Sequence, residues 1–357
     1  MKRVIVSVTN NLVTDQRVER VCQSLHKWGF DVLLVGRAWP RISMPPRDYS
    51  CKRLKHLFNR KFLFYAEYNI RLFFFLLFHK ADILLANDLD TLPANFFVSK
   101  IKRSKLIFDS HEYFSETPEV YKRRFVRIFW LFIEKRIIGG CDQYYTVSGK
   151  LADIYQQKYN VRFSVIRNLP VTLPENFTNN NSRIIIYQGS INIGRGLELM
   201  LQAMLLLPDA ILVIVGDGPE LKKLKEIANS LNVLERVQFT GTLLPDRLRE
   251  LTGKAAVGIS LEEAVGQSYF VALPNKLFDY IQAGVPVLTS DLPEMAAIVK
   301  NYQVGMVLEE RTPESLASVL QLMLNDEVKR NFWKEKIASA RQELCWEKEE
   351  IKLKELF

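Results

Sequence analysis

Short apolar segments alternate with longer amphipathic segments along the whole chain, and this alternation most restricts the folds open to it. Continuous apolar strands are typical of parallel sheets, whose crossover connections are helices. The pattern therefore predicts an α/β protein built on parallel strands. We expect strands at 4–8, 31–35, 83–86, 105–108, 143–146, 164–166, 184–187, 211–215, 237–239, 257–259, 287–288 and 306–308, and helices that include 15–28, 197–206, 221–231 and 313–324.

The length of 357 residues is too great for one ordinary domain and fits two. Between positions 168 and 182 the chain has two prolines and five asparagines, a composition typical of an interdomain linker. We therefore expect a first domain over 1–168, a linker over 169–182, a second domain over 183–335 and a terminal helix over 336–357.

The charge is distributed unevenly. Residues 1–167 contain 29 Lys and Arg against 15 Asp and Glu, so the whole net charge of +9 arises in this half. Such an excess indicates an anionic partner. Its basic segment 52–61 leads into the aromatic segment 62–78, and 121–130 is similar. Glu67, Asn69 and Arg71 interrupt the apolar run, which argues against a membrane span. Two interpretations stay open: buried core helices, or helices on an anionic membrane surface.

The cysteines at 22, 51, 141 and 345 form no Cys-x-x-Cys pair and have no histidine at ligand spacing. This favours reduced thiols in a cytoplasmic protein over disulfides or a zinc site. The first eight residues resemble a β-strand more than a signal peptide.

The segment 273–288 carries the clearest chemical signal. Asn275 and Lys276 open an amphipathic helix that Gly284 ends, and a buried strand follows. The amino end of a helix presents unpaired N–H groups and partial positive charge, which together with a lysine suit a phosphate. Asp279 lies one turn further on, within reach of a sugar hydroxyl beside that phosphate.

Two glycine-rich loops also follow strands of the second half. In 187–197, Gly189, Gly194 and Gly196 allow close approach of the backbone to a ligand, and Arg195 supplies a charge for a diphosphate. The loop lacks the G-x-G-x-x-G pattern of dinucleotide-binding proteins. A second turn contains Gly216 and Gly218.

These three segments resemble the donor-nucleotide regions of GT4 glycosyltransferases, which have the GT-B fold. The resemblance implies two Rossmann-like domains with parallel sheets facing an interdomain cleft, and a terminal helix that crosses back onto the first domain. It also implies retaining, metal-independent transfer of a sugar from a nucleotide diphosphate, UDP being the first expectation, with no cofactor. The expected acceptor is an envelope saccharide, polysaccharide or lipid-linked sugar, met at the inner face of the cell membrane.

Two segments of the first half strengthen this resemblance. Residues 109–112, Asp-Ser-His-Glu, resemble an Asp-x-His-Glu signature found in some GT4 enzymes, and His111 is expected to bind the donor sugar or orient the acceptor hydroxyl. Residues 15–18, Asp-Gln-Arg-Val, resemble the family's Asp-x-Arg-Val opening, in which the aspartate caps the first helix. Asn10 and Asn11 replace the usual Gly-Gly of the preceding loop.

The resemblance thus assigns a set of site residues. The expected catalytic residues are Arg195, Lys276 and His111. The expected donor-binding residues are Gly189, Ser190, Gly216, Gly218, Asn275 and Asp279. The expected cleft or acceptor residues are Asn10, Asn11, Arg17 and Glu112.

The chain departs from the family pattern at Val271, where a glutamate is usual eight residues before the helix carboxylate. Counted along the chain, Glu262 and Glu263 are too far upstream to replace it. A second point concerns Asp88-Leu89-Asp90, which has the spacing of a metal-binding D-x-D string. Its place between a strand and Thr91-Leu92-Pro93 favours helix capping instead.

Other functions stay open. A sugar-nucleotide epimerase has the same fold, while a phosphorylase is disfavoured because no lysine lies in a plausible Schiff-base context. The basic first half would also suit a nucleic-acid-binding protein. That hypothesis leaves the phosphate-binding pattern of the acidic second half without a purpose, so no nucleic-acid partner is expected.

Overall fold

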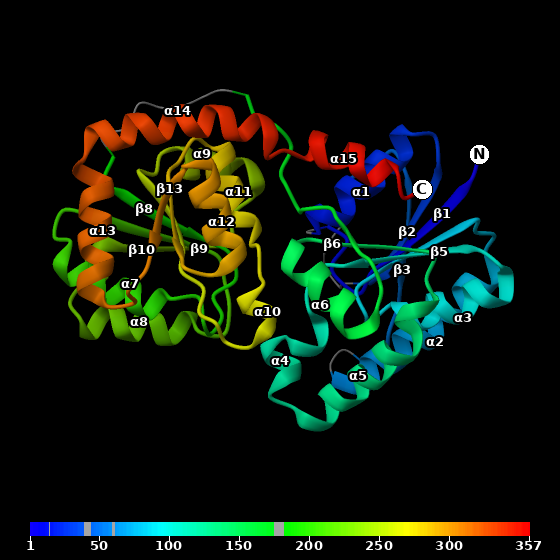
Figure 1. The fold of residues 1–357 in the computed structure, drawn as a ribbon. Coiled ribbons are helices and arrows are strands. Elements are labelled where there is room, and N and C mark those ends of the chain that lie inside the picture. The colour runs from blue at the N-terminus through cyan, green and yellow to red at the C-terminus, as the bar shows by residue number, and fades with distance from the viewer. Residues whose placement is uncertain (14, 39–43, 59–60, 175–181) are drawn as a thin grey trace. The chain divides into compact units, whose positions relative to one another are not determined.

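The computed structural model describes residues 1–13, 15–38, 44–58, 61–174 and 182–357. The chain divides into two compact units, the first made of Met1–Asn168 with Glu349–Phe357 and the second of Leu169–Lys348 (Figure 1). Each unit is built on its own parallel sheet with helices packed against it. The predicted α/β class with two Rossmann-like domains is confirmed. Part of the expected linker, 175–181, lies outside the described residues.

The described residues of the first unit form a seven-stranded sheet of order β3-β2-β1-β4-β5-β6-β7, in which all neighbours are parallel. Its strands are β1 (Arg3–Ser7), β2 (Asp31–Arg37), β3 (Ser50–Leu54), β4 (Ile83–Asn87), β5 (Lys105–Ser110), β6 (Gln143–Thr146) and β7 (Ser164–Val165). Its helices are α1 (Gln16–Lys27), α2 (Lys61–Phe78), α3 (Leu92–Lys102), α4 (Pro118–Tyr121), α5 (Arg124–Ile137) and α6 (Gly149–Tyr159).

The second unit has, within the described residues, a six-stranded parallel sheet of order β10-β9-β8-β11-β12-β13. Its strands are β8 (Ile184–Gln188), β9 (Ile211–Val215), β10 (Val237–Gly241), β11 (Val257–Ser260), β12 (Val287–Ser290) and β13 (Gly305–Leu308). Its helices are α7 (Leu197–Ala203), α8 (Leu221–Ser230), α9 (Pro245–Gly253), α10 (Gln267–Phe270), α11 (Asn275–Gln282), α12 (Pro293–Tyr302), α13 (Pro313–Asn325) and α14 (Glu327–Glu343).

Alternate residues of the second sheet supply two separate cores. Ile185 and Tyr187 of β8 pack in one cluster with residues of α7, α8 and α13. Ile186, between them in the sequence, packs in the other cluster with residues of α11, α12 and α14. Successive side chains of a strand point to opposite faces, so an uninterrupted apolar run buries both faces of the sheet.

Both sheets reverse the direction in which the chain adds strands. After β1 the chain places β2 and β3 on one side and then begins β4 on the other, and it does the same with β9, β10 and β11 around β8. The carboxyl ends of the strands that flank such a reversal form a crevice in which α/β proteins bind ligands. Ligand sites are therefore expected after β1 and β4 in the first unit and after β8 and β11 in the second.

Two elements differ from the prediction. Strand β3 was not expected, because its sequence Ser-Cys-Lys-Arg-Leu lacks an apolar run, and it lies at an edge of the sheet where exposed basic side chains are tolerated. The prediction of one continuous terminal helix is wrong: α14 ends at Glu343, and α15 (Trp346–Lys354) follows as a separate helix. The turn is fixed from outside the segment, because the Gln282 amide donates to the Leu344 carbonyl and the Trp346 N–H donates to Pro170.

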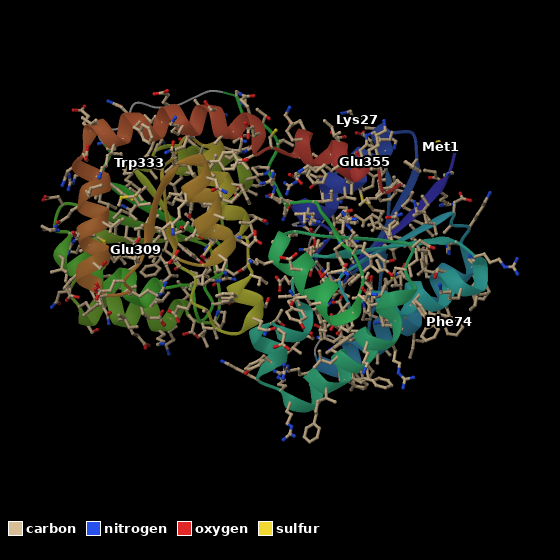
Figure 2. The ribbon with its side chains drawn as sticks, in the orientation of Figure 1. Met1, Lys27, Phe74, Glu309, Trp333 and Glu355 are labelled. Atoms are coloured by element: carbon tan, nitrogen blue, oxygen red, sulfur yellow. The ribbon has the colours of Figure 1, made fainter. Side chains whose placement is uncertain are left out.

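The aromatic segment 62–78 forms helix α2, which is apolar on both its inner and outer faces. Phe64, Tyr68 and Leu72 are buried on one side, whereas Phe74 is exposed on another side, as Figure 2 shows for Phe74. Phe78, at the end of the helix, is also exposed. Within the part of the chain that the structure describes, no helix is both long enough and apolar enough to cross a membrane.

Candidate functional site

The loop after β8 takes its shape from glycines. Gly189 and Gly196 have φ values of 136° and 71°, a region that favours glycine. A Cβ at position 196 would lie 2.3 Å from the carbonyl oxygen of Leu261. This close approach holds the β8 loop against the residues that follow β11, and it brings Arg195 next to Glu262.

Arg195 and Lys276 converge on one carboxylate. The Lys276 ammonium donates to Oε1 of Glu262 at 2.7 Å, and the Arg195 guanidinium donates to the same oxygen at 3.3 Å. Ser260 donates to the other carboxylate oxygen at 2.7 Å. The Glu262 side chain is fully buried, while those of Lys276 and Arg195 keep 8% and 20% of their surface exposed. We call Glu262, Lys276 and Arg195 the cation cluster.

The cluster holds its central carboxyl in the ionised form. Burial alone would raise the pKa of Glu262, but the charges of Lys276 and Arg195 outweigh it and bring the pKa below its usual range. Arg311 supports the backbone of this segment, since its guanidinium donates to the carbonyl oxygens of Leu261 and Glu262.

Lys276 occupies the first turn of α11, as the sequence predicts for a helix beginning at Asn275. The helix is fixed to the sheet by the buried side chains of Phe278, Tyr280 and Ile281. The Lys276 ammonium lies 4.0 Å from the centre of the Tyr187 ring, a cation–π contact at the end of β8. Asn275 is exposed at the amino end of α11.

The second glycine-rich turn packs directly on the β8 loop. A Cβ at Gly216 would lie 1.9 Å from the carbonyl oxygen of Gly189, and one at Gly218 would lie 2.3 Å from that of Ile191. Ser190, in the loop they support, is exposed. The expected donor-binding glycines therefore lie together, and they bring two loop backbones close to Lys276.

Asp279 faces the end of β8. Its carboxylate accepts a hydrogen bond from the side-chain Nε2 of Gln188 at 3.0 Å, and the side-chain Oε1 of Gln188 accepts one from the Thr252 hydroxyl at 2.8 Å. Asp279 remains partly exposed. Reasoning from the sequence did not select Gln188, which contacts the predicted donor-binding residue Asp279.

Glu262 corrects the reasoning from residue counts. Counted along the chain it is too far upstream to replace the glutamate missing at Val271, yet it contacts both predicted cations, and Val271 is a buried apolar residue. The segment between them contains the short helix α10, so distance along the chain does not measure distance in space. The sequence pattern that could have identified Glu262 is a carboxylate that closely follows an apolar strand beside the point where the sheet reverses its strand order.

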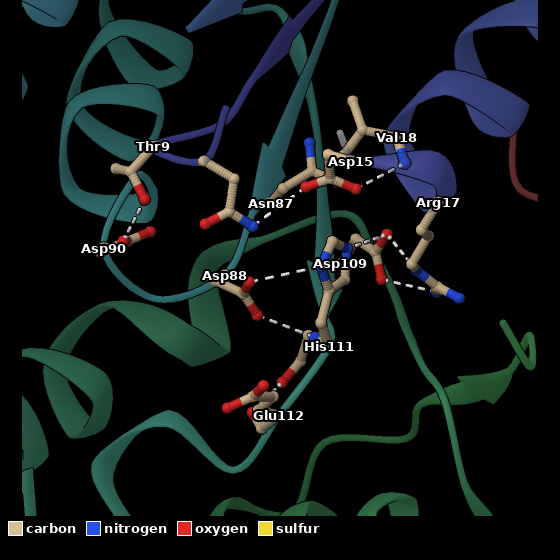
Figure 3. Close-up of polar contacts among 12 residues, drawn as sticks. Thr9, Asp15, Arg17, Val18, Asn87, Asp88, Asp90, Asp109, His111 and Glu112 are labelled. Carbon is tan, nitrogen blue, oxygen red and sulfur yellow. Dashed lines mark hydrogen bonds and ion pairs between the residues drawn. The ribbon is translucent and has the colours of Figure 1, made fainter. Parts of the chain in front are cut away.

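In the first unit, a second charged cluster surrounds His111 (Figure 3). Nε2 of the imidazole lies 2.8 Å from Asp109 and Nδ1 lies 3.3 Å from Asp88. The backbone N–H of His111 also donates to Asp88 at 2.8 Å. Arg17 donates through two nitrogens to the Asp109 carboxylate, at 2.8 and 3.1 Å. Asp88 follows β4, Asp109 lies at the end of β5, His111 follows β5, and Arg17 lies on α1.

The charges in this cluster are mutually balanced. Burial lowers the pKa of an imidazole, but Asp109 and Asp88 outweigh it and raise the pKa of His111 to about 9. Burial likewise raises the pKa of a carboxyl, but Arg17 and His111 bring that of Asp109 down to about 2. At neutral pH His111 is therefore an imidazolium whose two ring nitrogens face carboxylates, an arrangement suited to positive charge rather than to a general base.

The remaining predicted residues of the first unit shape the loops. Asp15 caps α1 by accepting from the Val18 N–H, which confirms the predicted cap. Asn10 donates to Asp15 at 3.0 Å, and Asn11 accepts from the Val13 N–H. The Arg17 side chain is buried and donates to the Asp109 carboxylate. Glu112 is exposed, and its carbonyl oxygen accepts from Ser110.

The prediction that Asp88 or Asp90 caps a helix is wrong. The N-cap of α3 is Thr91, without a side-chain cap, while Asp88 binds His111 and Asp90 accepts from Thr9 at 2.5 Å. Burial and the neighbouring Asp88 raise the pKa of Asp90 to about 7. Over the described residues, no group of three or more His, Cys, Asp and Glu side chains is placed to hold a metal ion.

Comparison with known proteins gives matches to two family models. "Glycosyltransferase Family 4" matches residues 15–169, and "Glycosyl transferases group 1" matches residues 172–340. The crystal structure of Anabaena HepE in complex with UDP and glucose superposes with a TM-score of 0.79 at 13% identity, covering 99% of each chain.

Two curated relatives match over shorter stretches. An uncharacterized glycosyltransferase of Methanocaldococcus jannaschii is 28% identical over 41% of this chain and 37% of its own length. A GDP-mannose-dependent alpha-(1-6)-phosphatidylinositol monomannoside mannosyltransferase of Mycobacterium tuberculosis is 30% identical over 33% of this chain and 31% of its own length. The chain thus spans about a third of the length of these relatives. Together with the two parallel α/β units, the family matches establish that the chain belongs to the GT4-like glycosyltransferases of the GT-B fold.

Proposed function

We propose that this protein transfers a sugar from a nucleotide-diphosphate donor to a saccharide or lipid-linked acceptor, with retention of anomeric configuration and without a metal ion. The observation that carries the proposal is the cation cluster, in which Lys276 and Arg195 meet at one buried carboxylate beside the amino end of α11.

The chemistry follows from the charge of the leaving group. When the bond between the anomeric carbon and the distal phosphate oxygen breaks, its electron pair stays on the diphosphate, whose negative charge grows. Lys276, Arg195 and the first N–H groups of α11 stabilise this growing charge more than the charge of the intact donor. Glu262 holds both cations in place before the donor binds, so little reorganisation is needed during the reaction.

The other predicted residues of the second unit are proposed to bind the donor. Gly189, Ser190, Gly216 and Gly218 supply backbone without bulky side chains near the diphosphate and the nucleoside. Asn275 lies at the open end of α11, and Asp279 offers a carboxylate to a sugar hydroxyl. UDP is the proposed nucleotide, which agrees with the UDP bound by HepE.

For the first unit we propose that His111, as an imidazolium, provides positive charge near the transferred sugar. Asp109, Asp88 and Arg17 orient it. Asn10, Asn11 and Glu112 are proposed to contact the acceptor from the neighbouring loops. The acceptor is an envelope saccharide or lipid-linked sugar in this proposal, and the four free thiols support a cytoplasmic location.

The test is a donor screen. The full chain is incubated with UDP-, GDP- and ADP-sugars, with and without EDTA, and release of the nucleoside diphosphate is measured together with the melting temperature. We expect one donor to raise the melting temperature and to be turned over slowly in the presence of EDTA. The absence of any stabilising donor would refute the proposal.

The same assay separates the two enzyme classes of this fold. An epimerase releases a changed free sugar or sugar nucleotide without consuming an acceptor, whereas a transferase turns over faster when a suitable acceptor is added. For a retaining transferase, proton NMR of the product shows the anomeric configuration of the donor.

A further inference from the structure

A band of large apolar side chains covers the outer surface of the first unit, on helices α2, α3 and α5. We call it the outer band. The exposed fraction of its residues reaches 79% at Phe78 and 87% at Phe125. The members that the argument uses are Phe62, Phe74 and Phe78 on α2, Phe97 on α3, and Phe125 and Phe132 on α5.

The outer band is not needed for the core of the unit. Helix α5 buries Trp130, Glu134 and Ile137 on its inner side, while Phe125 and Phe132 point to the opposite side of the same helix. Helix α2 similarly buries Tyr68 and Leu72 and exposes Phe74. Contiguous exposed apolar surface of this kind marks an interaction site.

The band is continuous from one helix to the next. The rings of Phe62 on α2 and Phe129 on α5 are in edge-to-face contact, with centroids 5.5 Å apart. Helix α3 packs on both α2 and α5, and the three helices lie close together on one side of the first sheet (Figure 1).

The charges around the band have one sign. Residues 121–136 contain six Lys and Arg and a single acidic residue, Glu134. Glu134 is 1% exposed and is paired inwards with Lys158, so it does not offset the outer charge. Glu67 on α2 is paired with Arg71 at 2.7 Å. An outer face with exposed aromatic rings and basic residues at its margins fits the boundary between anionic headgroups and acyl chains.

We propose that the outer band docks the first unit on an anionic lipid bilayer, with its phenylalanines in the headgroup region and Lys122, Arg123, Arg124 and Arg136 on the phosphates. The helices lie on the membrane surface. The choice of a lipid-linked acceptor follows from this docking only if the proposed transferase activity also holds, whereas the docking itself does not depend on that activity.

The experiment is co-sedimentation of the full chain with phosphatidylcholine vesicles and with mixed phosphatidylcholine–phosphatidylglycerol vesicles. One variant combines Phe125→Ser with Phe132→Ser, and another combines Arg123→Gln, Arg124→Gln and Arg136→Gln. The control variants Leu244→Ser and Lys222→Gln remove an exposed apolar side chain and an exposed charge from the second unit.

We expect binding to the mixed vesicles alone, a loss of at least about tenfold in each band variant, and wild-type binding in both controls. The charge variant also loses the salt dependence of binding. Equal binding to both kinds of vesicle, or wild-type binding by both band variants, would overturn the proposal. A wild-type dimer in light scattering that the band variants abolish would assign the band to a second copy of the chain.

Failure of this proposal is distinct from failure of the proposed function. Donor hydrolysis without vesicle binding removes the docking and keeps the transferase, and vesicle binding without any donor turnover does the reverse.

Discussion

Glu262→Gln tests the cation cluster directly, because it removes one negative charge and keeps the shape of the side chain. The wild-type carboxylate is fully buried and lies 2.7 Å from Lys276 and 3.3 Å from Arg195. Removing one partner of a buried ion pair costs about 3–5 kcal/mol. Water reaches part of Arg195 and screens its charge, so we expect a loss of about 2–4 kcal/mol.

That loss corresponds to a fall in melting temperature of roughly 5–15 °C for a unit of this size. The donor should reverse part of it. A bound diphosphate supplies the negative charge that glutamine lacks, so UDP is expected to raise the melting temperature of Glu262→Gln more than that of the wild type. Differential scanning calorimetry with and without UDP measures both effects.

Glu263→Gln is the matched control. Its carboxylate is about 42% exposed and lies 3.5 Å from Arg311, so its loss should change stability by less than about 1 kcal/mol. If Glu262→Gln melted like this control, or if UDP stabilised the wild type and Glu262→Gln equally, the cation cluster would not work as described.

The stability that Glu262 contributes should fall in acid. The pKa of Glu262 is lower in the folded protein than in the unfolded chain. Its stabilisation is therefore present above the unfolded value of about 4.3 and is lost as the pH falls through the lower folded value. The difference between wild type and Glu262→Gln should persist at neutral pH and shrink in acid.

Lys276→Ala and Arg195→Ala should each lower donor turnover by at least about tenfold in the hydrolysis assay, and near-normal rates in both would remove them from the site. His111, whose pKa is raised to about 9, should stabilise the protein fully below its unfolded pKa of about 6.5 and lose up to about 3 kcal/mol as the pH rises through 9. Melting curves of His111→Gln should lack this alkaline decline, and an unchanged decline would refute the assignment. Gly216→Ala would place a Cβ 1.9 Å from the Gly189 carbonyl oxygen and should weaken UDP binding in calorimetry. Gly253→Ala is the control: a Cβ there would meet no neighbouring atom within 4 Å, so this variant should bind UDP normally.

The parts of the fold that depend on local patterns could be predicted from the sequence. Strand β9 begins and ends where its apolar run Ile211–Val215 does, because both faces of a strand inside the sheet are buried. Strand β3 could not be found in this way, since an edge strand needs no apolar run. The break between α14 and α15 depends on hydrogen bonds from Gln282 and to Pro170, which are distant in the sequence.

The same division applies to the site. Lys276 could be predicted because the beginning of α11 is a local feature, written in the change from polar to apolar residues. The partners of Lys276 and Arg17 could not, because Glu262 is brought in by the path of the intervening chain and Asp109 is 92 residues from Arg17. The sequence showed two cations, whereas the folded chain presents a carboxylate held between them.

This difference changes how the diphosphate is expected to bind. With Glu262 ionised, the cation cluster carries one net positive charge instead of two, so its attraction for the donor in the ground state is weaker than the two side chains suggest. The N–H groups of α11 must then supply part of the binding. In return the two cations are already in position when charge develops, which favours the transition state. Glu262→Gln should therefore separate the two effects, lowering KM for the donor while also lowering kcat, and a parallel loss of affinity and rate would show that the carboxylate does more than hold the cations.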